Sequence, residues 1–229
     1  MNLRYINRTD RAVIGACALS LTFFSINAKL DSVIPLYLNG LIVLSVFTYW
    51  AVRRDPTGIL KRSLIIGSIA GASYAFVDKM FVETQIITYL RPDVNVFETP
   101  ASVVLIWMCS ITIVIYFYQR LRPAFNRFYM PSALTGASAF ISGTVLNELG
   151  DHARLWVWNV GIPSSPAIGS TPLFVPIALF VTFFLSPYII GGQHITPRIG
   201  FQKNSIAAGL RCAIILAATI FLAFRILTR

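Results

Sequence analysis

Asp78 is the acidic residue of this chain that most needs an explanation. It follows the aromatic and apolar run from Ser73 to Val77. It comes about fifteen residues into a long apolar segment, so a helix rising about 1.5 Å per residue would bury it in the outer third of a bilayer. A charged carboxylate at that depth is costly unless it is protonated, paired or hydrated. The residues support two interpretations equally: a functional acid, or an ion pair with Lys79 or another interfacial base.

A second acidic group, Glu148 and Asp151, comes near the end of a later apolar segment and is followed by His152. Residues three and four apart share a helix face, so Glu148 would meet Asp151 and His152 if a helix continued through Gly150. The deeper position of Glu148 in the membrane segment favours a functional role for it, whereas Asp151 and His152 taken singly are typical of a solvated helix end. Asp78, Glu148 and Asp151 are the three candidate catalytic acids.

Aromatic side chains are expected at the same depth as these acids. Trp156 and Trp158 follow the second acidic group, and Tyr74 and Trp107 come from other apolar segments. An aromatic belt at the membrane interface is the ordinary explanation. The alternative is a pocket that surrounds an apolar ligand and stabilises positive charge with its ring faces. The candidate substrate-binding residues are Tyr74, Phe76, Trp107, Trp156, Trp158 and Asn159.

The composition predicts that membrane helices hold these residues. Hydrophobic residues make up 56% of the chain and charged residues only 12%, whereas a soluble domain carries about 25% charged residues. The mean hydropathy is +0.70. This small number of charges cannot cover a water-exposed surface. Most of the outer surface must therefore face lipid. We therefore expect an all-α polytopic helical bundle, with residues 1–229 forming a single transmembrane domain.

About seven apolar segments approach the length of about 20 residues that a membrane-spanning helix needs. They are expected at Ala12–Ala28, Val33–Val52, Ser63–Val82, Thr99–Tyr118, Pro131–Leu149, Thr171–Gly191 and Ser205–Leu227. Gly67 and Gly71 in the third segment, and Gly136, Ala139 and Gly143 in the fifth, predict closely packed helices in the bundle interior.

The distribution of charge predicts the orientation in the membrane. With a cytoplasmic amino terminus and a carboxyl terminus on the opposite side, twelve of the nineteen Lys and Arg residues fall on the cytoplasmic side, as the positive-inside rule requires. Acidic residues show the reverse bias. Those at or near the opposite side are Asp31, Asp78, Glu83, Asp93, Glu98, Glu148 and Asp151.

Several function classes are disfavoured by what the sequence contains. The net charge of +10 is explained by topology and contact with membrane lipids better than by nucleic-acid binding. Cys17, Cys109 and Cys212 lie in three separate apolar runs, which predicts neither a disulfide framework nor a zinc site. With only His152 and His194, an iron or haem site is not favoured either. The last apolar segment has no lysine for a retinal Schiff base, and hydrolase, phosphate-loop and zinc-protease motifs do not occur. We expect no metal and no cofactor.

This layout resembles the small seven-helix integral-membrane terpene cyclases of fungal meroterpenoid and indole-diterpene pathways and their bacterial relatives. The segments 74–78 and 147–159 carry the resemblance. It implies a carboxylic acid that protonates an epoxide or alkene of a polyprenyl chain and then guides a carbocation cascade, with Asp78 and Glu148 as the acids. The family's late acidic residue has no counterpart in the seventh segment. The run from Thr171 to Pro176 is also similar to membrane carotenoid-modifying proteins.

The leading hypothesis is therefore an acid-catalysed isoprenoid cyclase that takes an apolar isoprenoid or lipid substrate from the bilayer. It would lie in the plasma membrane of a bacterium or the endoplasmic reticulum of a eukaryote. The rival is a proton-coupled or lipid transporter that uses the same carboxylates, with Pro172, Pro176 and Pro187 interrupting the sixth segment. A third hypothesis is that the protein is a scaffold or a partner-binding subunit. The sequence does not indicate the oligomeric state or the substrate.

Overall fold

The structure is a computed structural model that describes residues 6–30, 32–91, 93–127, 129–159, 166–190 and 199–228. The chain is mostly helical, as the composition predicts. Its α-helices are α1 (Arg8–Leu30), α2 (Ile34–Arg53), α3 (Ile59–Glu83), α4 (Ala101–Leu121), α5 (Tyr129–His152), α6 (Phe174–Phe184), α7 (Ser186–Ile190) and α8 (Ile199–Leu227), and a short 3-10 helix, η1 (Arg122–Ala124), follows α4.

Five helices in the described part of the chain are long and apolar enough to cross a membrane: α1, α2, α3, α4 and α8. Helix α5 is 24 residues long but less apolar, and α6 is apolar but has only 11 residues. The expected sixth segment divides after Leu185, where α6 gives way to α7. Pro187 explains the division, because its ring nitrogen has no hydrogen to donate to the preceding helical turn.

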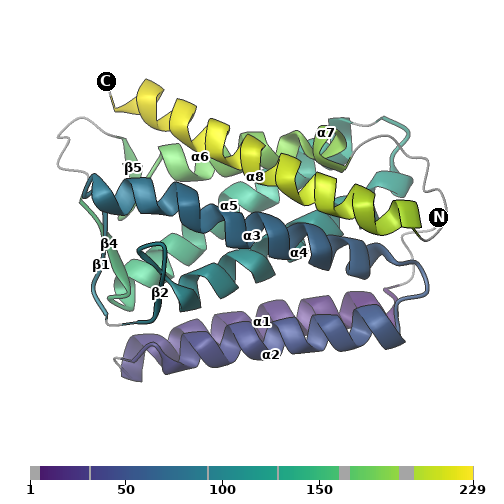
Figure 1. Ribbon diagram of the computed structural model, residues 1–229, viewed down its shortest axis with the longest axis horizontal. Coiled ribbons are helices and arrows are strands. Elements are labelled where there is room, and N and C mark those ends of the chain that lie inside the picture. The colour runs from purple at the N-terminus through teal and green to yellow at the C-terminus, as the bar shows by residue number, and fades with distance from the viewer. Residues whose placement is uncertain are drawn as a thin grey trace.

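Five helices form a ring around the principal core, in which α3 contacts α4 and α8, α5 contacts α4 and α6, and α6 contacts α8. Helices α1 and α2 pair with each other and pack on the outside of this ring through α2 against α3 and α4 and α1 against α5. Figure 1 shows the pair along one side of the bundle. Helix α1 begins at one end of the bundle and α8 ends at the other.

Small residues allow the ring helices to approach closely, as the spacing of Gly67 and Gly71 predicts. A Cβ atom added at Gly71 would lie 2.5 Å from the backbone nitrogen of Met108, and one at Gly67 would lie 2.6 Å from that of Thr112. A Cβ atom at Gly143 would collide with Leu179 of α6. The predicted close packing of these two stretches is confirmed.

Six short strands gather at one end of the bundle. They are β1 (Ile87–Tyr89), β2 (Asn95–Val96), β3 (Thr99–Pro100), β4 (Trp156–Trp158), β5 (Ala167–Ile168) and β6 (Thr171–Pro172). They form three antiparallel pairs: β1 with β4, β2 with β3 and β5 with β6. Because β1 lies in the α3–α4 connection and β4 in the α5–α6 connection, their pairing joins the two loops (Figure 1). The all-helical prediction did not include these strands.

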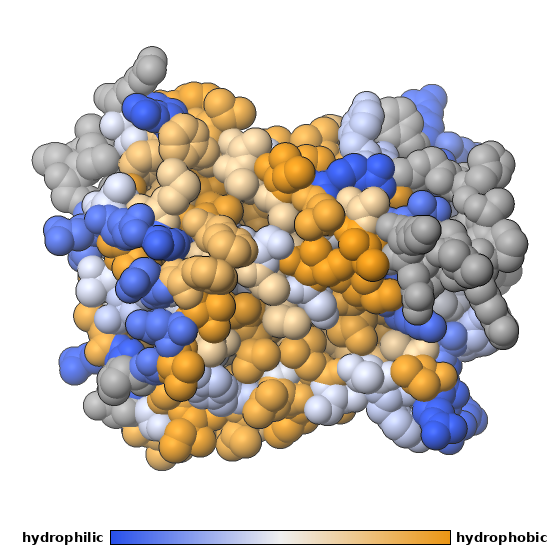
Figure 2. Space-filling view, in the orientation of Figure 1, coloured by the Kyte–Doolittle hydropathy of each residue, from blue (hydrophilic) through white to orange (hydrophobic). Residues whose placement is uncertain are grey.

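The surface is divided into three zones along the bundle. Figure 2 shows hydrophobic residues across the middle and hydrophilic residues gathered at both ends. Many large hydrophobic side chains of the helices are exposed, among them Ile14, Leu21, Ile141 and Ile214. In a membrane protein, lipid covers such a band.

Candidate functional site

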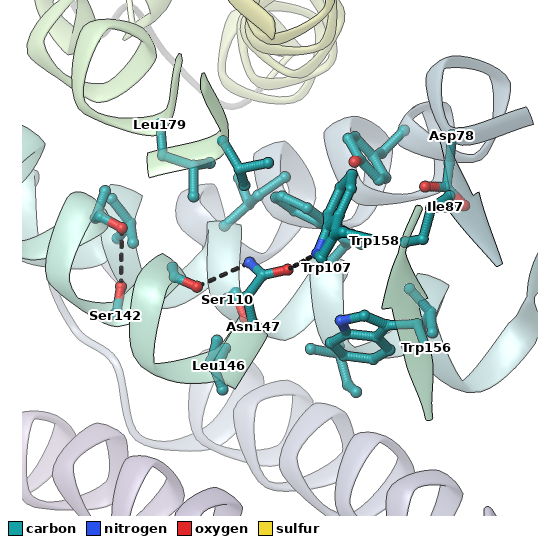
Figure 3. Close-up of a pocket in the computed structure, with 18 of the residues that line it drawn as sticks. Asp78, Ile87, Trp107, Ser110, Ser142, Leu146, Asn147, Trp156, Trp158 and Leu179 are labelled. Carbon is teal, nitrogen blue, oxygen red and sulfur yellow. Dashed lines mark hydrogen bonds between the residues drawn. The ribbon is translucent and has the colours of Figure 1, made fainter. Parts of the chain in front are cut away.

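A cavity of about 80 Å³ lies inside the helix ring, at the end where the strands gather (Figure 3). Its walls come from α3, α4, α5 and α6, and β1 and β4 contribute further side chains to it. We call this cavity the acid chamber, because the carboxyl group of Asp78 is part of its lining.

Asp78 is 1% exposed and lies five residues before the end of α3. Its Oδ2 atom accepts hydrogen bonds from the Tyr89 hydroxyl at 2.6 Å and the Thr99 hydroxyl at 2.8 Å. In the described part of the chain no donor bonds Oδ1. The basic side chain next to it in the sequence, Lys79, pairs instead with Glu83 at 3.4 Å. The carboxyl group therefore has one oxygen held by hydroxyl groups and one oxygen available to the chamber.

The chain reverses direction directly after α3, and this reversal brings Tyr89 back to Asp78. Gln85 adopts a positive φ of 56°, and Ile86 donates its backbone N–H to the Phe81 carbonyl at 2.8 Å. Strand β1 then runs back along the end of the bundle. Thr99 approaches from β3, just before α4, and its hydroxyl oxygen also lies 3.3 Å from the Ala75 carbonyl oxygen.

Tyr89 remains a hydrogen-bond donor over a wide pH range. Burial, followed by the negative charge of the nearby Asp78, raises the pKa of Tyr89 well above its ordinary value. A phenol that does not ionise keeps its proton for the bond to Oδ2. Tyr89 and Thr99 were missed by the sequence analysis, because they lie in a loop whose path the sequence pattern does not reveal.

Aromatic rings form much of the remaining wall. Tyr74 and Trp107 lie against each other with ring centroids 4.0 Å apart. Trp158 meets Phe174 edge-on at 5.7 Å, and its indole N–H donates to Asn147 Oδ1 at 3.1 Å. These contacts hold the rings in place along the wall of the acid chamber.

Trp156 carries a polar group that has no partner among the residues that the structure describes. The residue is 7% exposed, lines the acid chamber and covers Gly150, where any side chain would collide with its ring. Its indole Nε1 is buried and has no hydrogen-bond acceptor among the described residues. Because an unpaired buried donor is unfavourable, this N–H marks a place where a ligand acceptor would be stabilised.

Four of the six candidate substrate-binding residues line the chamber: Tyr74, Trp107, Trp156 and Trp158. The other two do not. Phe76 is exposed and lies against Phe97 with centroids 4.3 Å apart. Asn159 is exposed and donates its side-chain amide to the Thr88 hydroxyl.

Glu148 and Asp151 do not line the acid chamber. The Oε1 atom of Glu148 accepts three hydrogen bonds: from the Ser170 backbone N–H at 3.0 Å, the Ser170 hydroxyl at 3.1 Å and the Thr171 hydroxyl at 2.5 Å. Helix α5 does continue through Gly150 to His152. The Glu148 carboxylate nevertheless bonds the turn between β5 and β6, while Asp151 is half-buried and His152 exposed.

The described residues contain no group of three or more His, Cys, Asp or Glu side chains that could hold a metal ion. No protein-family model, curated protein or solved structure matches the chain. The geometry of the acid chamber is therefore the basis for a function.

Proposed function

We propose that this protein is a membrane-embedded isoprenoid cyclase in which Asp78 protonates an epoxide or alkene of a polyprenyl substrate. The observation that supports this most directly is the buried carboxyl group of Asp78 in an aromatic chamber, where no donor of the described residues bonds its Oδ1 atom. Burial favours the neutral form of a carboxyl group, which is the form that donates a proton.

The hydrogen bonds around Asp78 suit the proton-transfer step. With two donors on Oδ2, the proton of the neutral acid resides on Oδ1 and faces the substrate. The Oδ1–H bond breaks, the epoxide oxygen takes the proton, and a C–O bond opens to leave a carbocation. An internal alkene then attacks this cation to form a C–C bond. The new Asp78 carboxylate keeps the bonds from Tyr89 and Thr99, which become stronger as charge develops.

The aromatic wall supports the second half of the reaction. The faces of Tyr74, Trp107 and Trp158 offer negative π-density to a moving cation. The same rings exclude water, so the cation is not captured early. The reaction ends when the final cation loses a proton, either directly to give an alkene or after adding water to give an alcohol. In both cases the released proton balances the one that Asp78 supplied.

The unpaired N–H of Trp156 favours a substrate that carries oxygen. An epoxide oxygen is an acceptor and an alkene is not, so only the epoxide would satisfy the buried Nε1 donor. We therefore favour the epoxide as the initiating group.

We further propose seven membrane crossings, with the amino terminus in the cytoplasm and the acid chamber near the opposite face. Helix α5, about 36 Å long at 1.5 Å per residue, supplies the fifth crossing. Helices α6 and α7 together supply the sixth. The excess of Lys and Arg at the ends expected in the cytoplasm supports this orientation. The membrane is the plasma membrane in a bacterium and the endoplasmic reticulum in a eukaryote.

The test is product formation by the purified protein in lipid nanodiscs, given matched polyprenyl epoxides and plain polyprenyl chains. We expect the epoxide to be cyclised, Asp78→Asn to be inactive, and Trp156→Phe to lose activity toward the epoxide in particular. Unchanged turnover in Asp78→Asn would refute the assigned acid. Uptake of unaltered lipid into proteoliposomes, driven by a pH gradient and without conversion, would replace the cyclase with the transporter.

A further inference from the structure

A second cavity of about 200 Å³ adjoins the acid chamber, and we call it the tail chamber. It lies between the α1–α2 pair and helices α4 and α5. Side chains of α4 and α5 line both cavities. These shared residues are Ile106, Ser110, Val114, Ser142 and Leu146.

The walls of the tail chamber suit a hydrocarbon chain. Its lining includes Leu21, Phe24 and Ile113, and no charged side chain of the described residues lines it. One hydrogen bond joins two of its polar side chains: the Ser20 hydroxyl donates to Asn39 Oδ1 at 3.0 Å. A polar headgroup would therefore find few partners here, whereas an apolar chain would lose no hydrogen bonds.

The tail chamber reaches the lipid-facing surface between α1 and α5. Leu21 of α1 is 50% exposed and Val145 of α5 is 42% exposed, yet both also line the chamber. Both residues lie in the interior of their helices, away from the ends, and the two helices contact each other. This position lies within the hydrophobic middle zone of the bundle, where the neighbouring solvent is lipid.

The acid chamber contains a carboxyl group and the tail chamber contains no charged side chain of the described residues, and the two chambers share a wall. The acid chamber alone is small beside the 300 Å³ or more of typical ligand pockets, so a polyprenyl chain must extend beyond it. Figure 3 shows Asp78 on one side of the acid chamber and Ser142 and Leu146 on the other. Ser142 and Leu146 belong to the shared wall, so an extended ligand would leave the acid chamber on the side away from the carboxyl group.

We propose that a linear isoprenoid enters sideways from the bilayer between α1 and α5, at Leu21 and Val145, and keeps its tail in the tail chamber. The position of the reactive end at Asp78 rests on the proposed function. A ligand can occupy the tail chamber without being converted, so its binding there can be tested separately from the cyclase reaction.

Photo-crosslinking locates the tail directly. The probe is a linear polyprenyl epoxide with a diazirine at the end opposite the epoxide, applied to the protein in nanodiscs and mapped by peptide mass spectrometry. We expect label on α1 around Leu21 and on α5 around Val145, both in the native protein and in Asp78→Asn. Label confined to lipid-facing helices elsewhere, such as α8, would overturn the proposal.

Substitutions at the opening test the route with matched controls. Val145→Trp should weaken binding of a long epoxide about tenfold, equivalent to about 1.4 kcal/mol or two buried methylene groups, and spare a short epoxide. Ile141→Trp is the control, because Ile141 lies one turn earlier on α5, is 63% exposed and does not line the chamber. Equal effects of the two substitutions would contradict the proposal.

An independent pair on α1 guards against misfolding of the α5 variants. Leu21→Trp should act like Val145→Trp, whereas Ile14→Trp, two turns earlier and 57% exposed, should leave binding unchanged. Labelling at α1 and α5 without any turnover would refute the cyclase but retain the tail chamber. Turnover without labelling at α1 and α5 would refute occupation of the tail chamber but retain the cyclase.

Discussion

Asp78 and Glu148 lie near the same end of the bundle, one close to the end of α3 and the other close to the end of α5. Their surroundings differ. Asp78 has hydroxyl donors on Oδ2 and lines a cavity with the rest of its carboxyl group. Glu148 has three donors on Oε1, two of them from Ser170 alone, and lines no part of the acid chamber.

The difference separates two uses of a carboxyl group in a membrane protein. A carboxylate bonded by several neighbouring donors is stabilised in its charged form and holds those donors in place. A carboxyl group that faces an apolar chamber with an unbonded oxygen can exchange a proton with a ligand. The two acids lie at similar distances from the ends of their helices, but Asp78 is buried and Glu148 only half-buried. Burial and the local donors together therefore decide which role each acid can take.

The largest expected effect is that of Asp78→Asn on turnover. Loss of a general acid lowers a rate by about a hundredfold or more, whereas Glu148→Gln should leave turnover close to the native value because an amide oxygen can replace Oε1 as an acceptor. Product formation by mass spectrometry measures both. Equal losses in the two variants would abolish the distinction between the two acids.

Tyr89→Phe should have the next largest effect, about tenfold on turnover. It removes one hydrogen bond to Oδ2, and a bond to a charged group contributes about 1.5–3 kcal/mol. The loss should appear in kcat more than in KM, since the bond strengthens as Asp78 becomes charged. Thr99→Val is the companion variant for the second donor. If KM alone changed, Tyr89 would be a wall residue and not a positioning residue for the acid.

Glu148→Ala should reduce stability more than catalysis. It removes the acceptor for Ser170 and Thr171, and we expect the free energy of unfolding to fall by about 2 kcal/mol. Denaturant unfolding in mixed micelles measures this loss, and Glu148→Gln should recover most of it. A variant that unfolds like the native protein would show that the turn between β5 and β6 does not depend on this carboxylate.

Gly169→Ala should give the smallest effect, a loss of about 1 kcal/mol in the free energy of unfolding. Gly169 has a φ of +60°, and a Cβ atom there would also collide with the Glu148 carboxylate. Gly15→Ala on α1 is the control, because its Cβ would meet nothing within 4 Å and alanine favours a helix. The same unfolding assay should therefore show opposite signs for the two substitutions.

Five helices, α1 to α4 and α8, could be predicted from length and hydropathy, because a membrane segment must satisfy its own backbone hydrogen bonds. The same criterion does not identify α5, which is less apolar, or the expected sixth segment, which divides into α6 and α7. Strands of two or three residues leave no such pattern. Pairing of Tyr89 with Trp156 joins two separate loops, so it could not be foreseen from either loop alone.

The site residues that lie on a helix could be predicted from the sequence. Asp78 and Tyr74 are four residues apart on α3 and share its buried face, whereas Phe76 lies about 200° around the helix from Asp78 and is exposed. The donors to Asp78 come from β1 and β3, and those to Glu148 come from the turn after β5 and from the first residue of β6. Because loop geometry decided which donors met which acid, the sequence alone ranked the two acids as near equals.

The pairing of β1 with β4 would affect which products the proposed cyclase releases. Tyr89 and Trp156 face each other across this pair, and Arg91 ties its edge to the carbonyls of Ala153 and Arg154. Because residues of both paired strands line the acid chamber, parting of the two loops would let bulk solvent reach it. In a cyclase, how often that happens would set the proportion of alcohols to olefins among the products, so these few loop residues would govern product identity without touching the helices.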